Sequence, residues 1–225
     1  METIKQRDVS TAQDLIAAVR DRSVDRIVVS GDLAGLSSLE LLPNQALTAA
    51  ARATLQFKDD SDGIRLSSNN KLENLTLIAA PEKRAIFNDT TVTDLGRLEL
   101  RNLTLTGAIQ ILAADRVRSG HVEAHNIDRI VTRGNGAVGI QISQPVGEIS
   151  VRRGIETFGG RGESLVKGVM TNLSAIAFSV KAGGAVRALT VAGGLTTHGS
   201  AVAALDVEGS VESLSLKGGV TTSGG

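Results

Sequence analysis

The chain has 225 residues, of which 41% are hydrophobic, and its 24 Lys and Arg residues balance its 24 Asp and Glu residues. Without net charge or a block of like charges it lacks the electrostatic attraction that nucleic acids and anionic membranes require, and we expect neither as a partner. The absence of Cys excludes disulfides and Cys-based metal sites.

The first predicted element is a short amphipathic helix over residues 10–21. Ser10 and Gln13 have the spacing of a capping box, and apolar residues follow from Ala12 at the i, i+3, i+4, i+7 spacing of one helical face. A helix at this place would cover the unpaired strand edges and exposed core at the end of a stack of strands. The residues before it lack the basic start and apolar stretch of a secretory signal, and no apolar run is long enough to span a bilayer.

Beyond residue 24 the sequence predicts short β-strands separated by Gly, Asn, Asp, Ser and Pro. Aromatic residues make up only 2% of the chain and Gly numbers 25, a composition that suits a thin, regularly stacked core. The strands expected in the less regular first part are 26–29, 38–41, 46–48, 53–57 and 63–66.

A three-residue pattern then marks successive repeats: Asn or Gly, an apolar residue and a polar residue. Asn and Gly most readily adopt the left-handed backbone conformation that a sharp corner before a strand requires. The intervals run from 18 to 28 residues and average roughly 24, which lies in the range of solenoid repeats. The pattern begins at Asn74, Asn102, Asn126, Gly154, Asn172, Gly194 and Gly219.

Each repeat contains three strand-like pieces, and hairpin turn signals are missing apart from Asn135-Gly136, which also fits a corner. With its capping helix, three-strand repeats and corner Asn residues (Asn74, Asn102 and Asn126), the chain resembles the right-handed parallel β-helix proteins of the pectin lyase-like superfamily. The resemblance implies an all-β fold, namely a right-handed single-stranded parallel β-helix with three strands per coil, an N-terminal capping α-helix and a ladder of stacked asparagines.

The resemblance is one of architecture. The family's catalytic patterns do not carry over, because the chain has no Gly-His-Gly, Arg-Ile-Lys or Asp-Pro-His sequence. An extracellular or surface location follows from the resemblance alone, and the sequence otherwise leaves the location open.

We divide the chain into an N-terminal cap, residues 1–24, and a parallel β-helix, residues 25–225. Residues 186–199 recur as 211–224 at a shift of 25 residues, and Gly225 follows in the middle of a repeat. Terminal repeats of solenoids need a polar cap. We therefore expect a β-helix that is incomplete at its C-terminal end, or one whose open end is buried by self-association.

The strand before each corner carries the residues most suggestive of chemistry, because alternate positions on it would face outward and stack. The three sets are Arg97, Glu99 and Arg101, then His121, Glu123 and His125, then Glu148, Ser150 and Arg152. The candidate catalytic acid or base residues are Glu123, His121 and Glu99. The candidates for binding the carboxylate of an acidic sugar are Arg97, Arg101, His125 and Arg152. The alternative is a solvated face with cross-strand ion pairs.

Metal sites are weakly indicated. Asp59, Asp60 and Asp62 lie in one loop and could hold Ca²⁺, but the loop lacks the distal Glu of a complete calcium loop, and a polar turn is the alternative. His121 and His125 would lie about 13 Å apart on a strand, too far to share one ion. The sequence therefore predicts no metal and no cofactor.

Two functions fit these observations. The first is a non-catalytic structural or carbohydrate- or protein-binding module of a larger surface or assembly protein, with a polysaccharide or another protein as partner. The second is a polysaccharide lyase, hydrolase or epimerase acting on acidic sugars. A carboxylate and His121 facing a groove walled by loops would favour the enzyme, and a flat open sheet would favour the module.

Overall fold

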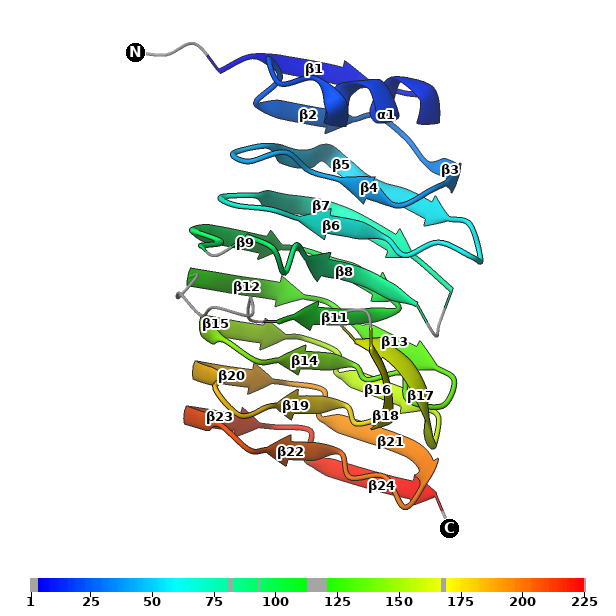
Figure 1. Cartoon of the computed structure of the whole chain (residues 1–225), viewed down its shortest axis with the longest axis vertical. Helices are drawn as coiled ribbons and strands as arrows, with labels where there is room; N and C mark the ends of the chain where they lie inside the picture. The colour runs from blue at the N-terminus through cyan, green and yellow to red at the C-terminus, as the bar shows by residue number, and fades with distance from the viewer. Residues whose placement is uncertain (1–3, 81–82, 93, 113–120, 167–168, 225) are drawn as a thin grey trace.

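The computed structural model describes residues 4–80, 83–92, 94–112, 121–166 and 169–224, without the side chains of 121–126 and 164–166. Within these residues the fold is all-β apart from one short helix. Figure 1 shows the strands stacked along the long axis, with the N-terminus at one end and the C-terminus at the other. Most strands pair in parallel, within two sheets.

The larger sheet has 15 strands. They are β1 (Gln6–Val9), β2 (Arg26–Val29), β3 (Leu33–Leu36), β5 (Ala46–Phe57), β7 (Lys71–Ile78), β9 (Arg97–Arg101), β10 (Thr104–Thr106), β12 (His121–Ile127), β13 (Ile130–Arg133), β15 (Pro145–Val151), β16 (Ile155–Phe158), β20 (Ala185–Val191), β21 (Leu195–Ser200), β23 (Ser210–Leu216) and β24 (Val220–Gly224).

The smaller sheet has seven strands, and a separate pair forms a hairpin. The seven are β4 (Leu39–Glu40), β6 (Ile64–Leu66), β8 (Arg84–Asn88), β11 (Ala108–Ile111), β14 (Ile140–Ile142), β19 (Phe178–Val180) and β22 (Leu205–Val207). The hairpin consists of β17 (Arg161–Val166) and β18 (Val169–Ser174).

The larger sheet divides in two where β7 turns a corner at Asn74, whose φ is 60°. The first half of β7 pairs with β9, and its second half pairs with β10. Beyond β7 one arm continues through β9, β12, β15, β20 and β23, and the other through β10, β13, β16, β21 and β24. We call these the first and the second arm. In Figure 1 both arms run down the stack beside the smaller sheet.

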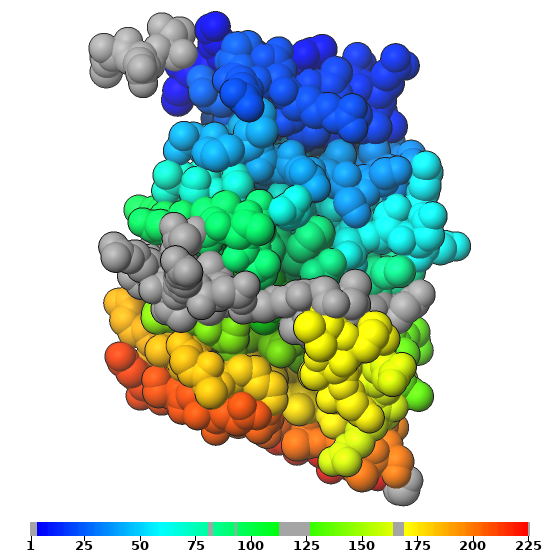
Figure 2. Space-filling view, viewed as in Figure 1, coloured from blue at the N-terminus to red at the C-terminus, as the bar shows by residue number. Residues whose placement is uncertain are grey.

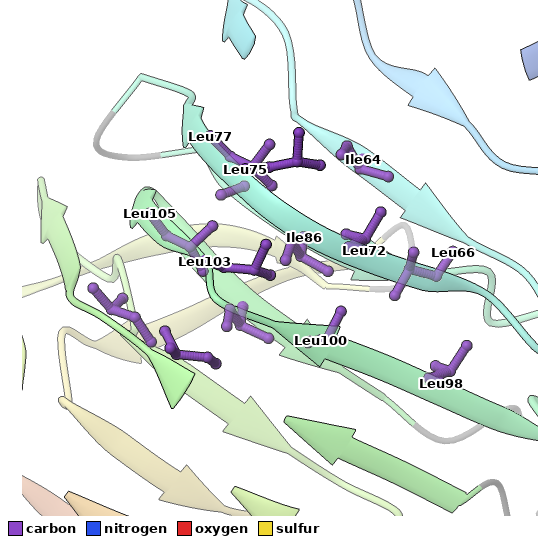
Figure 3. Packing of buried hydrophobic residues seen from close by; sticks show 14 of the residues in the cluster. Ile64, Leu66, Leu72, Leu75, Leu77, Ile86, Leu98, Leu100, Leu103 and Leu105 are labelled. Atoms are coloured by element: carbon purple, nitrogen blue, oxygen red, sulfur yellow. The ribbon is translucent and has the colours of Figure 1, made fainter. Parts of the chain in front are cut away.

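The core lies between these strands and consists mainly of Leu, Ile, Val and Ala. In the smaller sheet the parallel pairing aligns one large apolar residue of each strand from β6 to β22, so that these side chains stack in a column. They are Ile64, Ile86, Ile109, Ile140, Phe178 and Leu205. Figure 3 shows leucine and isoleucine side chains of successive strands directed into the same interior. Strands β9 and β10 alternate inward apolar and outward polar residues, which follows from the two-residue period of an extended chain.

The helix predicted near the N-terminus is confirmed with shifted bounds. Helix α1 spans Ala12–Arg20, and its N-cap is Thr11, whose hydroxyl accepts the backbone N–H of Asp14 at 3.1 Å. The cap is therefore one residue later than the box predicted from Ser10. Leu15, which is fully buried, lies on the face that packs on the first strands. Strand β1 precedes the helix and pairs in parallel with β2. The sequence analysis did not predict β1.

The corner pattern corresponds to positive φ at five of the seven predicted positions. Left-handed backbone at these places redirects the chain into the next strand. The five values are 60° at Asn74, 51° at Asn102, 111° at Gly154, 81° at Gly194 and 75° at Gly219. Asn126 lies in β12, and its side chain is outside the described part.

The corner predicted at Asn172 is wrong. Asn172 lies inside β18, where it pairs antiparallel with Glu163 of β17. The hairpin is inserted between β16 and β19, while Ile155 of β16 pairs directly with Leu195 of β21. Figure 2 shows this segment, in yellow, on the outside of the stack. The sequence Asn-Leu-Ser suits a strand of a hairpin as well as a corner, because both alternate polar and apolar residues.

The repeat at a shift of 25 residues predicted for the last part of the chain is confirmed by the pairing. Val186 pairs with Val211, and Leu195 pairs with Val220. On β23 and β24 the apolar side chains of Leu214 and Val220 are 46% and 52% exposed, because no strand of the described part covers that side.

Candidate functional site

The outward face of β9 has the alternation that the sequence predicts, and its charges are paired with one another. Glu99 accepts from Arg97 Nε at 2.8 Å and from Arg101 Nε at 3.2 Å. Leu98 and Leu100 between them are buried. Glu99 is therefore an ion-paired residue of this face.

The backbone of β12 stacks on β9 as expected. His121, Glu123 and His125 are in register with Arg97, Glu99 and Arg101. The side chains of these three β12 residues lie outside the described part of the chain, so their predicted roles stay predictions.

Arg152 does not join this face. The register between β12 and β15 shifts between Ala124 and Ile127, so that Val151 pairs with Ile127 and Arg152 follows the end of β15. One extra residue in β12 forms the irregularity, and Arg152 lies at the corner that leads into β16.

At this corner Arg152 lines an open hollow of about 480 Å³ on the surface of the second arm. We call it the arginine hollow. Gly193 and Gly194 lie at the stacked corner, where a side chain on Gly193 would meet the carbonyl oxygen of Arg153 at 2.0 Å. The small residues thus leave the space that the charged side chains surround. The lining residues are Arg129, Arg152, Arg153, Gly154, Ile155, Glu156, Gly193, Gly194 and Thr196.

Two of the three arginines of the hollow are paired. Arg153 forms an ion pair with Asp128, and Arg129 forms one with Glu156. Arg152 makes no ion pair or side-chain hydrogen bond with any residue that the structure describes. Among the described residues the guanidinium of Arg152 is thus outside any ion pair, although its charge acts on Asp128, and it lies beside two paired arginines.

The carboxylates of this corner stay ionised. Burial raises the pKa of Glu156, but hydrogen bonds from Arg129 and His198 outweigh burial, so that this pKa is below its ordinary value. The pKa of Asp128 is lowered chiefly by its hydrogen bond from Arg153. Both groups carry a negative charge at neutral pH and keep the paired arginines in place.

Glu156 also begins a chain of hydrogen bonds along the second arm. Its Oε1 lies 3.0 Å from Nε2 of His198, and Nδ1 of His198 lies 2.8 Å from Oγ of Ser223. The three residues come from β16, β21 and β24. The sequence analysis did not single out this group. The signal available was the repeat at a shift of 25 residues, which aligns His198 with Ser223.

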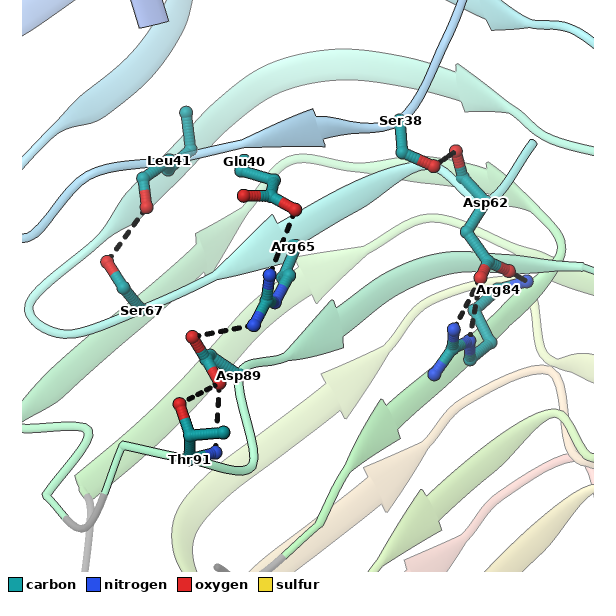
Figure 4. Close-up of polar contacts among 9 residues, drawn as sticks. All are labelled: Ser38, Glu40, Leu41, Asp62, Arg65, Ser67, Arg84, Asp89 and Thr91. Carbon is teal, nitrogen blue, oxygen red and sulfur yellow. Dashed lines mark hydrogen bonds and ion pairs between the residues drawn. The ribbon is translucent and has the colours of Figure 1, made fainter. Parts of the chain in front are cut away.

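The acidic loop predicted as a weak calcium site is held by other contacts. Asp62 accepts from the backbone N–H of Arg84 at 2.9 Å and from its Nε at 3.2 Å, as Figure 4 shows. Asp60 accepts from the hydroxyl of Ser61, and Asp59 lies exposed in the turn. Within the described ranges no three His, Cys, Asp or Glu side chains gather as metal ligands would.

No helix in the described part of the chain has the length and apolar character needed to cross a membrane. No protein-family model matches the sequence, and neither a curated protein nor a solved structure shows significant similarity to it.

Proposed function

We propose that this protein is a binding module whose arginine hollow holds an acidic carbohydrate without acting on it chemically. The observation that carries the proposal is the guanidinium of Arg152, which lines the hollow without an ion pair or side-chain hydrogen bond among the described residues. A planar guanidinium donates two parallel hydrogen bonds to a carboxylate. Arg129 and Arg153, which are ion-paired, line the same hollow.

Other features of the hollow suit a sugar ring. Gly193 and Gly194 allow a ligand to approach the backbone, while Thr196 offers a hydroxyl to the hydroxyls of a sugar. The formal net charge of the chain is zero, so a local cluster rather than a global field attracts the anion. A uronic acid combines the carboxylate and the hydroxyls that this lining would recognise.

The fold that presents the hollow is, we infer, a right-handed parallel β-helix with three strands per coil. Strands β9, β10 and β11 are followed by β12, β13 and β14, and each of the second three pairs in parallel with its counterpart among the first three. Right-handedness follows from the general preference of parallel crossover connections. At one corner Asn102 donates to Asn74, as in an asparagine ladder.

The binding proposal is tested by calorimetry with a trigalacturonate. The comparison ligands are its methyl-esterified, uncharged form and inorganic phosphate. We expect the acid to bind, the methyl ester to bind far more weakly, and Arg152→Gln to weaken binding of the acid by about tenfold, the value of one lost charge-assisted hydrogen-bond pair.

The matched control is Arg187→Gln, because Arg187 is an exposed arginine of β20 that pairs with Glu148 outside the hollow. Equal affinity for the acid and the ester, or equal loss in the two variants, would contradict the proposal. Tighter binding of phosphate than of the uronate would reassign the hollow to a phosphorylated ligand.

The alternative function is a polysaccharide lyase, hydrolase or epimerase acting on acidic sugars. The specific observation in its favour is that Glu156, a carboxylate bonded to an imidazole, lines the same hollow. Incubation with uronic-acid polymers decides between the two. Cleavage or epimerisation by the wild type that Glu156→Gln abolishes would establish the enzyme.

Self-association is a second proposal, supported by the exposed apolar residues Leu214 and Val220 on the last strands. Sedimentation velocity of the wild type and of Leu214→Lys would test it. A mass that falls from dimer to monomer in the variant is expected, and a monomeric wild type would refute it.

A further inference from the structure

We infer that Ser223 is an activated nucleophile, with His198 as its general base and Glu156 as the residue that positions the base, and that this group cleaves carboxylic esters. The inference goes beyond the binding proposal and does not depend on it. It rests on the two hydrogen bonds of His198, one to each of these partners, at 2.8 and 3.0 Å.

The charge on Glu156 determines which nitrogen of His198 carries the proton. An ionised carboxylate only accepts hydrogen bonds, so Nε2 of His198 must donate to Glu156. In the neutral imidazole Nδ1 then has a free lone pair. The hydroxyl of Ser223 lies 2.8 Å from this nitrogen and 3.4 Å from the carbonyl oxygen of Thr197, and the shorter contact is the hydrogen bond that it donates to His198. This is the arrangement in which a base removes the proton of a nucleophile.

The imidazole is held in this orientation from two further directions. Its ring stacks on Phe158, with centroids 4.3 Å apart and planes 9° from parallel. Arg133 lies over the ring of Phe158 at 4.1 Å, and the carboxylate of Glu156 is anchored by Arg129. Fixing the rotamers around a catalytic group reduces the entropy lost in the reaction.

Access also suits a nucleophile. Ser223 is exposed, and the side chain of His198 is 34% exposed, whereas that of Glu156 is 24% exposed. The outer two groups of the chain are thus open to a ligand, and the carboxylate that orients them is the most covered. A triad of this kind is recognised by its geometry and roles and recurs on unrelated folds.

The reaction follows from the positions of the proton. Oγ of Ser223 attacks the ester carbonyl and its proton passes to Nδ1 of His198, after which the C–O bond to the alcohol breaks and the alcohol leaves with that proton. Water then attacks the acyl-serine, giving one proton to His198, and the acid departs as Oγ regains its proton. One ester and one water become one acid and one alcohol, without any change of oxidation state.

The first test is labelling with a fluorophosphonate, which forms an Oγ–P bond with an activated serine and releases fluoride. We expect peptide mass spectrometry to find the label on Ser223. The matched control is Ser200→Ala, because Ser200 is an exposed serine at the end of the neighbouring strand β21 and makes no side-chain hydrogen bond among the described residues. That variant should label at the wild-type rate, and Ser223→Ala should not label.

The second test separates the base from the positioning residue with p-nitrophenyl acetate. His198→Gln should slow ester hydrolysis by about 100-fold, the usual contribution of a general base. The pH profile of the wild-type rate should differ from that of His198→Gln, because the variant lacks the base. Glu156→Gln should lower the rate and Glu156→Asp should restore part of it.

Label spread evenly over exposed serines would overturn the inference. So would hydrolysis by Ser223→Ala at the wild-type rate, or an unchanged pH profile in His198→Gln. Ser223 is exposed, so its replacement leaves the core intact, and circular dichroism of each variant verifies the fold.

Discussion

The side-chain amide of Asn102 donates a hydrogen bond to Oδ1 of Asn74 at 3.1 Å, and both residues have positive φ. One residue type thus meets two demands of the corner, because its amide links neighbouring turns and its backbone tolerates the left-handed region.

Replacing Asn102 separates these two contributions. Asn102→Ala should lower the free energy of unfolding by about 2 kcal/mol. The variant loses the hydrogen bond to Asn74, and alanine tolerates the left-handed backbone conformation less well than asparagine does. Asn102→Gly should lose about 1 kcal/mol, since only the bond is removed. Urea unfolding measures both, and equal losses would show that backbone strain contributes nothing here.

The ion pair of Asp62 with Arg84 should make stability depend on acid pH. Burial raises the pKa of Asp62, but hydrogen bonds from Arg84 lower it further, and the result is below the ordinary value. A carboxyl whose folded pKa is depressed stabilises the fold above its unfolded pKa of about 3.9 and loses this contribution as pH falls through the folded value.

The measurement is the difference in unfolding free energy between the wild type and Asp62→Asn. It should be largest near pH 6 and shrink below about pH 4. Asp59→Asn is the control, because Asp59 is an exposed carboxylate of the same loop without an ion pair among the described residues. A pH-independent difference for Asp62→Asn would contradict the assignment.

Buried threonines in the second arm should differ in what their hydroxyls contribute. Thr157 and Thr197 are paired in register and fully buried, but Thr157 Oγ1 lies 2.5 Å from the carbonyl of Ala175 and Thr197 Oγ1 lies 3.4 Å from that of Val202. Thr→Val keeps the shape and removes the donor. Thr157→Val should cost about 1–3 kcal/mol and Thr197→Val less, by thermal or urea unfolding. The reverse order would be inconsistent with the geometry.

Glu156→Gln should strengthen anion binding while it weakens ester cleavage. The change removes a negative charge from the arginine hollow and releases Arg129 from its pair, so calorimetry should give several-fold tighter binding of trigalacturonate at low salt. The same variant loses the group that orients His198. Weaker binding would mean that Glu156 contacts the ligand directly.

Gly193→Ala should change the shape of the arginine hollow, because Gly193 is one of its lining residues. An added Cβ would lie 2.0 Å from the carbonyl oxygen of Arg153, so the adjacent corner would have to move. We expect a loss of at least about 2 kcal/mol in unfolding free energy together with loss of ligand binding. Gly160→Ala is the control, since its Cβ would meet only the side chain of Asn135, at 3.5 Å. Unaltered binding by Gly193→Ala would show that the corner is not part of the site.

The regular parts of the fold follow from local sequence. Helix α1, the corner at Asn74 and the repeat that pairs Leu195 with Val220 each depend on a few adjacent residues with a clear conformational preference. The hairpin of β17 and β18 could not be found in this way, because Asn172 and its neighbours fit a corner and a strand equally well.

The sites depend on register, which local patterns do not determine. Arg152 follows the end of β15 and lies in the hollow rather than on the β9 face. Ser223 and His198 are aligned by the repeat, but Glu156 reaches His198 only because the inserted hairpin leaves β16 and β21 paired.

That insertion shows how the architecture accommodates new sequence. The hairpin leaves the stack after β16, and the chain re-enters it at β19 in register with β14. A hairpin can therefore be inserted at a turn of this protein while the strands before and after the insertion keep their pairing register. Grafting a foreign hairpin at the same turn would be a way to add a recognition element while the pairing of Ile155 with Leu195 is retained.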